Sequence, residues 1–357
     1  GLETRIGYAG HDFASALGAP QVVVTRARRD ARAPTIASRF WLRLEALTGG
    51  MRRDGEKALL ARRLDAAAYA PARRPAPAPP AASRPRTIAV TEVDRLQADP
   101  YAFYARAVLH LSAWDAVDAE PSPAWRGTLV HGALEQWMKQ DGCAPDRLEA
   151  RIAAMLADTA THPLMRTLWT PRLAEAVRWI GEEMTANIAA GRSPIEAEIS
   201  GETVIAGVTL RGKADRIDRL ADGQLAIVDY KTGKAPSPKE VMAGYAMQLG
   251  LLGLIAENGG FAEVAGTPST FEYWSLARGS RGGLGHVTSP VAAGRDDRIA
   301  PDDFTRRSAG IFAAAAGKWL TGDEPFTAKL HPERAPYDDY DQLMRLDEWY
   351  GRGNGGD

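Results

Sequence analysis

The sequence has 357 residues but a single cysteine, Cys143. One thiol can form neither an internal disulfide nor a zinc or iron–sulfur site built from cysteines, so disulfide-stabilised folds and a bound iron–sulfur cluster are excluded for this chain. No apolar run approaches the roughly 18 residues of a membrane span, and residues 1–5 lack the features of a signal peptide. We therefore expect a cytoplasmic protein with no membrane partner. Because the first residue is not Met, we also expect a piece of a longer protein.

The chain has little excess charge of either sign, with a formal net charge of −1. This balance hides an asymmetry, because residues 1–86 contain 16 Lys and Arg against 7 Asp and Glu. The remainder is correspondingly acidic, and an acidic body that acts on nucleic acid needs cations to do so. Charges scattered over solvated faces would give the same composition.

Proline divides the sequence. Residues 71–86 contain six prolines and almost no large apolar side chain, which predicts an extended linker without a core of its own. The expected organisation is a head over residues 1–70, the linker over 71–86 and a main domain over 87–357. In the head, residues 21–25 (QVVVT) are typical of a short buried strand and residues 38–47 of a helix.

The main domain changes character at Pro194. Before it, the periodicity predicts helices that begin at Thr91 and that span 127–140, 146–157 and 171–190. Residues 195–231 are rich in Ile, Val and Thr and are interrupted by glycines, which predicts a three-stranded antiparallel meander. A helix over 238–257, a strand over 270–276 and helices over 301–320 and 340–350 follow. The expected fold class is α/β, a mixed sheet flanked by helices.

Residues 212–234 (GKADRIDRLADGQLAIVDYKTGK) carry the strongest chemical signal. On a strand, Asp229 and Lys231 share one face, and the preceding antiparallel strand brings Asp215 to a comparable height. Two carboxylates and a lysine are expensive to desolvate together unless a metal ion compensates the acids, and Mg²⁺ prefers carboxylates, waters and phosphate oxygens. An exposed hairpin with an ordinary Asp–Lys pair is the alternative.

Four motifs enlarge this group. GKADRID, IVDYKTGK and GYAMQL, together with RGTLVHGALEQW upstream, resemble the nuclease domain of the RecB family of PD-(D/E)XK nucleases, over about residues 88–350. TEVDRLQADPYAFYARAVLHL and YDDYDQLMRLDEW are similar more specifically to the C-terminal part of AddB, from AddAB helicase–nucleases of alphaproteobacterial type. Residues 5–30 resemble the end of the helicase-like region of AddB. The resemblance implies a restriction-endonuclease-like fold preceded by a small helicase-like remnant.

The resemblance also implies roles for individual residues. It assigns Asp215 and Asp229 to a catalytic Mg²⁺, for which Mn²⁺ can substitute, with His131 and the carbonyl of Tyr230 as further ligands. Lys231 would orient the attacking water and stabilise charge on the phosphate, and Gln248 would position Lys231 or the DNA. Tyr245, one helical turn before Gln248, would position the substrate. Leu252 stands where many relatives have a tyrosine, which removes one expected substrate contact.

The function implied is that of a Mg²⁺-dependent DNA exonuclease within a helicase–nuclease complex. It would hydrolyse single strands from a broken duplex end beside an AddA-like helicase–nuclease partner, in recombinational repair of double-strand breaks. One alternative is a catalytically decayed module kept for DNA binding or assembly. Another is a free-standing Cas4-like exonuclease, which the cysteine count and the helicase-like head disfavour.

Overall fold

The computed structural model describes residues 1–30, 33–66, 72–114, 123–157, 163–279, 283–335 and 339–350. The first residue of the expected linker, Pro71, and the last seven residues of the expected main domain lie outside the described residues. The chain divides into two units, Gly1–Ala70 and Pro71–Asp357, which we treat separately. Among the described helices, none combines the length and the apolar character that a membrane span requires.

The first unit contains three helices, α1 (Leu2–Ala16), α2 (Arg39–Leu47) and α3 (Gly55–Asp65). The predicted helix over 38–47 is confirmed, and the Ser38 side chain caps it by accepting a hydrogen bond from the Trp41 backbone N–H. The strand predicted over 21–25 is wrong. These residues form no strand, and none of the residues described between 1 and 66 is buried. A strand needs a partner for its backbone groups, and the pairing described in this unit is a bridge between Arg29 and Pro34.

A six-stranded mixed sheet forms the centre of the second unit. Its strands are β1 (Thr87–Ala89), β2 (Ser193–Ile205), β3 (Val208–Arg219), β4 (Leu225–Lys231), β5 (Pro268–Arg278) and β6 (Leu284–Thr288). The order is β1-β3-β4-β5-β6, with β2 paired to β3. The predicted meander is confirmed, because β2, β3 and β4 pair antiparallel in sequence. The β4–β5 pair is parallel, which makes the sheet mixed and leaves β4 at its centre.

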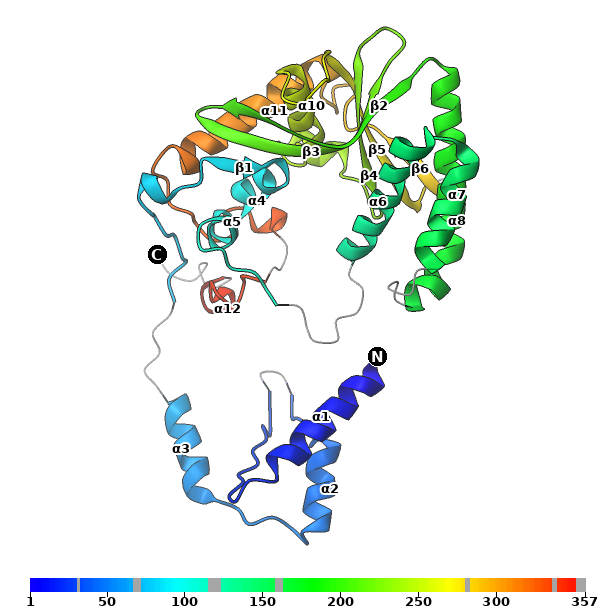
Figure 1. The fold of residues 1–357 in the computed structure, drawn as a ribbon. Coiled ribbons are helices and arrows are strands. Elements are labelled where there is room, and N and C mark those ends of the chain that lie inside the picture. Colours follow the sequence, from blue (N-terminus) through cyan, green and yellow to red (C-terminus); the bar gives the residue numbers. More distant parts are fainter. Residues whose placement is uncertain are drawn as a thin grey trace. The chain divides into compact units, whose positions relative to one another are not determined.

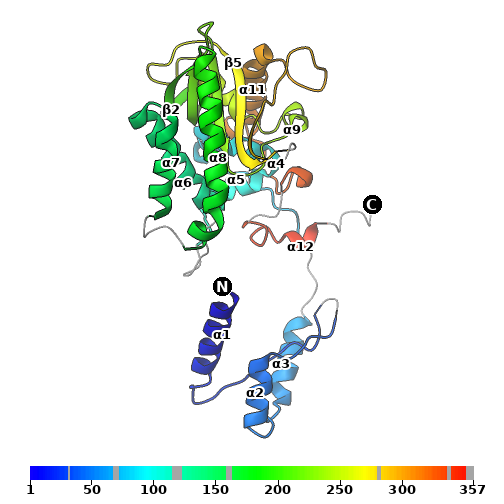
Figure 2. The same cartoon turned by 90° about the vertical axis from the view of Figure 1, so that its right-hand side faces the viewer.

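Helices cover both faces of this sheet (Figures 1 and 2). One face carries α6 (Pro123–Asp141), α7 (Pro145–Ala157) and α8 (Pro163–Ala189), and the other carries α10 (Gln248–Glu257) and α11 (Pro301–Ala315). Alternation along β4 builds both cores, because Ile227 belongs to the core under α10 while Val228 and Tyr230 belong to the core under α6–α8. The predicted α/β class, with a restriction-endonuclease-like mixed sheet flanked by helices, is confirmed.

Shorter helices complete the second unit and differ from the predictions at several ends. The region after Thr91 is a 3₁₀ turn followed by α4 (Val93–Ala98) and α5 (Pro100–Ala107). Further 3₁₀ turns occur at Ala81–Ser83 and Pro332–Arg334. The helix expected over 301–320 is α11 followed by a π-helical turn, Ala316–Leu320, and that expected over 340–350 reduces to α12 (Leu346–Trp349).

The helix expected over 238–257 is two helices. The first is α9 (Pro238–Met242), which begins in a capping box between Ser237 and Glu240, and the second is α10. Gly244 (φ 87°) and Ala246 (φ 54°) between them adopt left-handed backbone conformations, which end a right-handed helix.

The described part of the Pro-rich segment does not behave as the free linker that we predicted. Arg84 is buried and donates hydrogen bonds to the carbonyls of Trp319 and Glu324, both at 2.8 Å. The carbonyl of Pro77 accepts a hydrogen bond from the Phe326 N–H at 2.8 Å. The segment lacks apolar side chains, but its guanidinium and carbonyl groups satisfy backbone groups of residues 319–329. Backbone hydrogen bonding, which composition does not reveal, attaches it to the second unit.

Candidate functional site

The ends of β3 and β4 bring the predicted acids together. Arg216 pairs with Val228 in the antiparallel register, so Asp215 lies beside Tyr230. One carboxylate oxygen of Asp215 accepts a hydrogen bond from the Tyr230 backbone N–H at 2.8 Å. This bond fixes Asp215 to the segment that also carries Asp229, and the two carboxylates interact electrostatically.

Asp229, Lys231 and Gln248 form one connected group. Lys231 Nζ lies 2.7 Å from one oxygen of Asp229, and Gln248 Nε2 donates to the other oxygen at 2.8 Å. Lys231 Nζ also donates to Gln248 Oε1 at 3.4 Å. Asp229 is only 2% exposed, and its burial, together with the charge of Asp215, raises its pKa to about 6 in spite of the opposing effect of Lys231. Negative charge is thus concentrated where a cation would stabilise it.

His131 reaches the same place from α6. Its Nδ1 lies 3.1 Å from Glu198 Oε1 and 3.4 Å from Asp215 Oδ1, and its Nε2 lies 3.1 Å from the carbonyl oxygen of Tyr230. Burial lowers the pKa of His131, but the carboxylates of Asp215 and Glu198 outweigh this effect and raise the pKa to about 10. With acceptors facing both ring nitrogens, the imidazole is held as a cation among the acids.

Glu198 is a site residue that the sequence analysis missed. Ligand atoms of His131, Glu198 and Asp215 all lie within 4.8 Å of one another, and the Glu198 side chain is only 9% exposed. Its backbone has a φ of 52°, which departs from the extended conformation of the surrounding strand. The signal lay in the hairpin register, because Ala197 pairs with Arg216 and Ile199 with Ala214. Counting back from the turn at Gly207 would have placed Glu198 opposite Asp215.

Tyr230 holds the centre of the Asp-Tyr-Lys segment from the other face of the sheet. The buried Arg216 donates to the Tyr230 hydroxyl at 2.5 Å, and its guanidinium carbon lies 4.0 Å from the centre of the Trp274 ring. Burial raises the pKa of the Tyr230 phenol to about 12. The carbonyl of Tyr230 faces His131, and its predicted role as a metal ligand stays a prediction.

Tyr245 is not positioned as the sequence suggested. It lies in the turn between α9 and α10, so it does not stand one helical turn before Gln248. Its ring packs edge-on against His331, with centroids 6.3 Å apart, and lies 5.0 Å from the guanidinium carbon of Arg334. Its role in positioning substrate stays a prediction. Leu252, at the position of a tyrosine in many relatives, is buried in the core.

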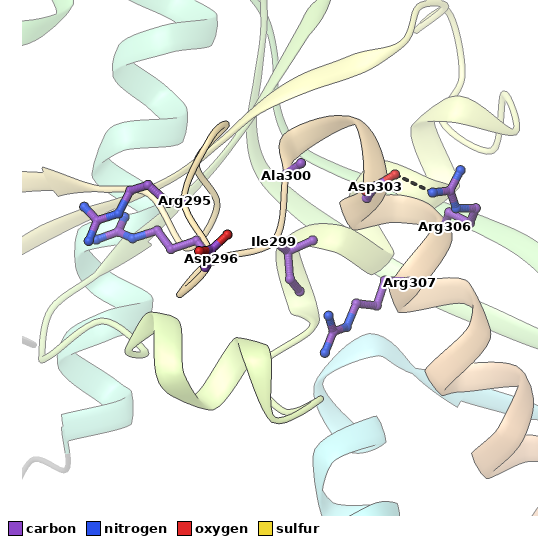
Figure 3. A pocket seen from close by; sticks show the side chains of 8 residues that line it. Arg295, Asp296, Ile299, Ala300, Asp303, Arg306 and Arg307 are labelled. Carbon is purple, nitrogen blue, oxygen red and sulfur yellow. Dashed lines mark hydrogen bonds and ion pairs between the residues drawn. The ribbon is translucent and has the colours of Figure 1, made fainter.

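A separate cavity of about 440 Å³ lies beside α11 (Figure 3). Arg306 pairs with Asp303 across it, and Arg307 donates a hydrogen bond to the carbonyl of Met242. None of the predicted site residues lines this cavity, whose lining residues are Arg295, Asp296, Arg298, Ile299, Ala300, Asp303, Arg306 and Arg307. The chemistry of the carboxylates, imidazole and lysine is therefore concentrated elsewhere, at the ends of β3 and β4.

A mixed sheet whose central strands end in clustered acids and a lysine is the arrangement of a nuclease class. The sequence model of the PD-(D/E)XK nuclease superfamily matches residues 87–329, well over half of the chain. The chain belongs to this superfamily.

Several relatives match shorter stretches. An uncharacterised protein of Rickettsia conorii is 29% identical over 195 residues, which is 51% of this chain and 23% of that protein. One of the subunits of the ATP-dependent helicase/deoxyribonuclease of Streptococcus mutans is 30% identical over 141 residues, which is 38% of this chain and 13% of that protein. The matched regions thus span less than a quarter of these relatives. A solved structure of a presumed exonuclease from Eubacterium rectale is 9% identical, with a TM-score of 0.39, and covers 72% of this chain and 92% of that one.

Proposed function

We propose that this chain is a metal-dependent DNA exonuclease. The observation that supports this most directly is the connected group of Asp229, Lys231 and Gln248, which lies beside the acids Asp215 and Glu198 in a member of the PD-(D/E)XK superfamily. A catalytically decayed module would have no need to retain a buried carboxylate and a lysine in this costly arrangement.

The donor set fits a hard divalent cation. Carboxylates, one imidazole and a carbonyl converge, and the strongly raised pKa of His131 indicates that the cluster attracts positive charge. The ion would be Mg²⁺ or Mn²⁺, held by His131, Glu198, Asp215, Asp229 and the carbonyl of Tyr230. When bound, such an ion supplies Lewis-acid stabilisation of phosphate oxygens and lowers the pKa of coordinated water.

The chain's own residues then have separable tasks. Lys231, fixed by Asp229 and Gln248, orients the attacking water and stabilises negative charge that develops on the phosphate. Gln248 holds both partners through one side chain, so the ammonium group is positioned before substrate arrives. In-line attack on the phosphodiester would leave a 5′-phosphate and a 3′-hydroxyl.

We further propose that the chain acts as the nuclease part of an AddB-like component of a helicase–nuclease. The Streptococcus mutans relative supports this, since it is named as part of an ATP-dependent helicase/deoxyribonuclease. The partner would be an AddA-like protein, the substrate would be single strands from a broken duplex end, and the role would be double-strand break repair.

Digestion of end-labelled single-stranded DNA with Mg²⁺, Mn²⁺ or EDTA tests the activity. We expect cleavage with either ion and none with EDTA. Lys231→Met should lower the cleavage rate by about 100-fold or more, because it removes a preorganised cationic group. The matched control is Lys239→Met, at an exposed lysine of α9, which should cut like the wild type. Equal cleavage by the two variants would refute the site.

A further inference from the structure

The position of Gln248 depends on how the N-terminus of α10 is held. Gln248 is the first residue of α10, and its amide contacts both Asp229 and Lys231. A shift of the first turn of α10 would therefore move the amide away from the Asp229–Lys231 pair. Whatever fixes the turn before α10 also fixes this pair.

The turn before α10 is not self-supporting. Ala246 adopts a left-handed conformation (φ 54°), which residues other than glycine adopt only at a cost in energy. The N-cap residue of α10 is Met247, whose side chain offers no capping hydrogen bond. Such a turn persists only when its surroundings hold it, so a second element must supply the acceptors that a Ser or Asp would normally provide.

Asp94 of α4 supplies them from 152 residues earlier in the chain. One of its carboxylate oxygens accepts a hydrogen bond from the Ala246 N–H at 2.9 Å, and the Met247 N–H also donates to this carboxylate. One turn further along α4, Gln97 Nε2 lies 3.5 Å from the carbonyl of Gly244. Two side chains of α4 thus hold the backbone that leads into α10.

Burial separates this contact from an ordinary surface cap. The second oxygen of Asp94 is buried and has no hydrogen-bond partner among the described residues. Burial is also the main reason that the pKa of Asp94 is raised to about 6. A carboxylate kept at such a cost is expected to do more than stabilise one helix end.

We infer that Asp94 is a positioning residue of the nuclease site, which caps α10 from a separate helix and so holds Gln248 against Asp229 and Lys231. This inference rests on the proposed function. Asp94 itself contacts backbone N–H groups of residues 246 and 247, and it acts on the chemistry through Gln248 alone.

A double-mutant cycle tests this route. Gln248→Ala and Asp94→Ala should each lower the cleavage rate of end-labelled DNA by about tenfold or more, and the double variant should be no more than about twofold worse than the poorer single variant. Asp94→Asn, which keeps an acceptor, should restore most of the rate. Ser237→Ala removes a comparable cap from α9, and its effect should multiply with that of Gln248→Ala. Multiplicative losses for Asp94→Ala would instead make its role merely structural.

Hydrogen exchange gives a measurement that does not depend on cleavage. In Asp94→Ala, the amides of residues 246–250 should exchange about tenfold faster or more than in the wild type, while Asp94→Asn should stay close to the wild type. Unchanged exchange in Asp94→Ala overturns the inference whatever the activity. If the wild type cuts no DNA with either ion, the proposed function fails, and the exchange result still shows whether Asp94 holds this turn.

Discussion

Glu198 and Asp229 lie at one site but in opposite electrostatic settings. Burial alone would raise the pKa of Glu198, but hydrogen bonds from His131 and Lys213 bring it below its ordinary value. The pKa of Asp229 is instead raised, to about 6, by burial and by Asp215. Two carboxylates whose pKa values are displaced in opposite directions are suited to different tasks. Glu198 is the more permanent negative charge of the pair.

Glu198 is therefore expected to contribute to metal affinity. Glu198→Gln keeps the size of the side chain and removes its charge, so the Mn²⁺ concentration for half-maximal binding should rise by about tenfold or more. Calorimetric titration with Mn²⁺ measures this directly. Glu202→Gln, on the same strand but at an exposed carboxylate paired with Arg211, is the control and should bind like the wild type. Equal affinity of the two variants would show that Glu198 is no part of the metal site.

Among the elements, the strands were the most predictable. Gly207 and the Asp222-Gly223 turn punctuate the β2–β3–β4 meander, and the alternation along Leu225–Lys231 assigns the face of Asp229. The break between α9 and α10 was not predictable, since Tyr245, Ala246 and Met247 are all compatible with a helix. A carboxylate from a distant helix stabilises the turn, and no local pattern reports such a contact.

The candidate site divides in the same way. Asp215, Asp229 and Lys231 were found because two adjacent strands and one turn relate them geometrically. Glu198 was missed because only pairwise counting through the hairpin reveals its neighbour. The strand expected at residues 21–25 failed for the converse reason, since β-propensity without a partner strand leaves backbone groups unpaired.

The contact between α4 and α10 gives a pH-dependent stability. Burial raises the pKa of Asp94 from 3.8 to about 6, and the charge of Glu240 adds to this, while the backbone hydrogen bonds oppose it. The folded state therefore binds the proton more tightly than the unfolded state does. The resulting stabilisation is complete below about pH 4 and is lost as the pH rises through about 6, a change of about 3 kcal/mol.

Asp94→Asn should remove this dependence. Relative to the variant, the wild type should lose stability between pH 4 and pH 7, and thermal unfolding of both proteins across this range measures the difference. The charged and titratable neighbours of Asp94, namely Glu240, Tyr245 and Tyr273, are the same in both proteins and cancel in the comparison. A constant difference in melting temperature over the range would contradict the raised pKa.

For the whole molecule, the two units differ in what supports them. The second unit has large cores on both faces of its sheet, whereas none of the residues described between 1 and 66 is buried. Leu42, Leu47 and Ile36 of the first unit are all more than half exposed. The first unit is therefore not expected to hold a stable fold when expressed alone.

The Pro-rich segment should be needed by the second unit. A fragment of residues 72–350 should be more stable than one of residues 87–350 by about 3 kcal/mol, because the shorter fragment loses the hydrogen bonds of the buried Arg84 guanidinium. Denaturant unfolding compares the two fragments. In the full chain, trypsin should cut at the exposed Arg73 but spare Arg84. Equal stability of the fragments, with rapid cleavage at Arg84, would restore the free linker.

The central position of β4 has a consequence for synthesis of the chain. Its residues Leu225–Tyr230 are all buried, and its parallel partner β5 begins only at Pro268. While the ribosome makes the intervening residues, β4 can pair with β3 but presents an open, apolar edge on its other side. The nascent chain is therefore most exposed to aggregation, and most in need of a chaperone, during this interval.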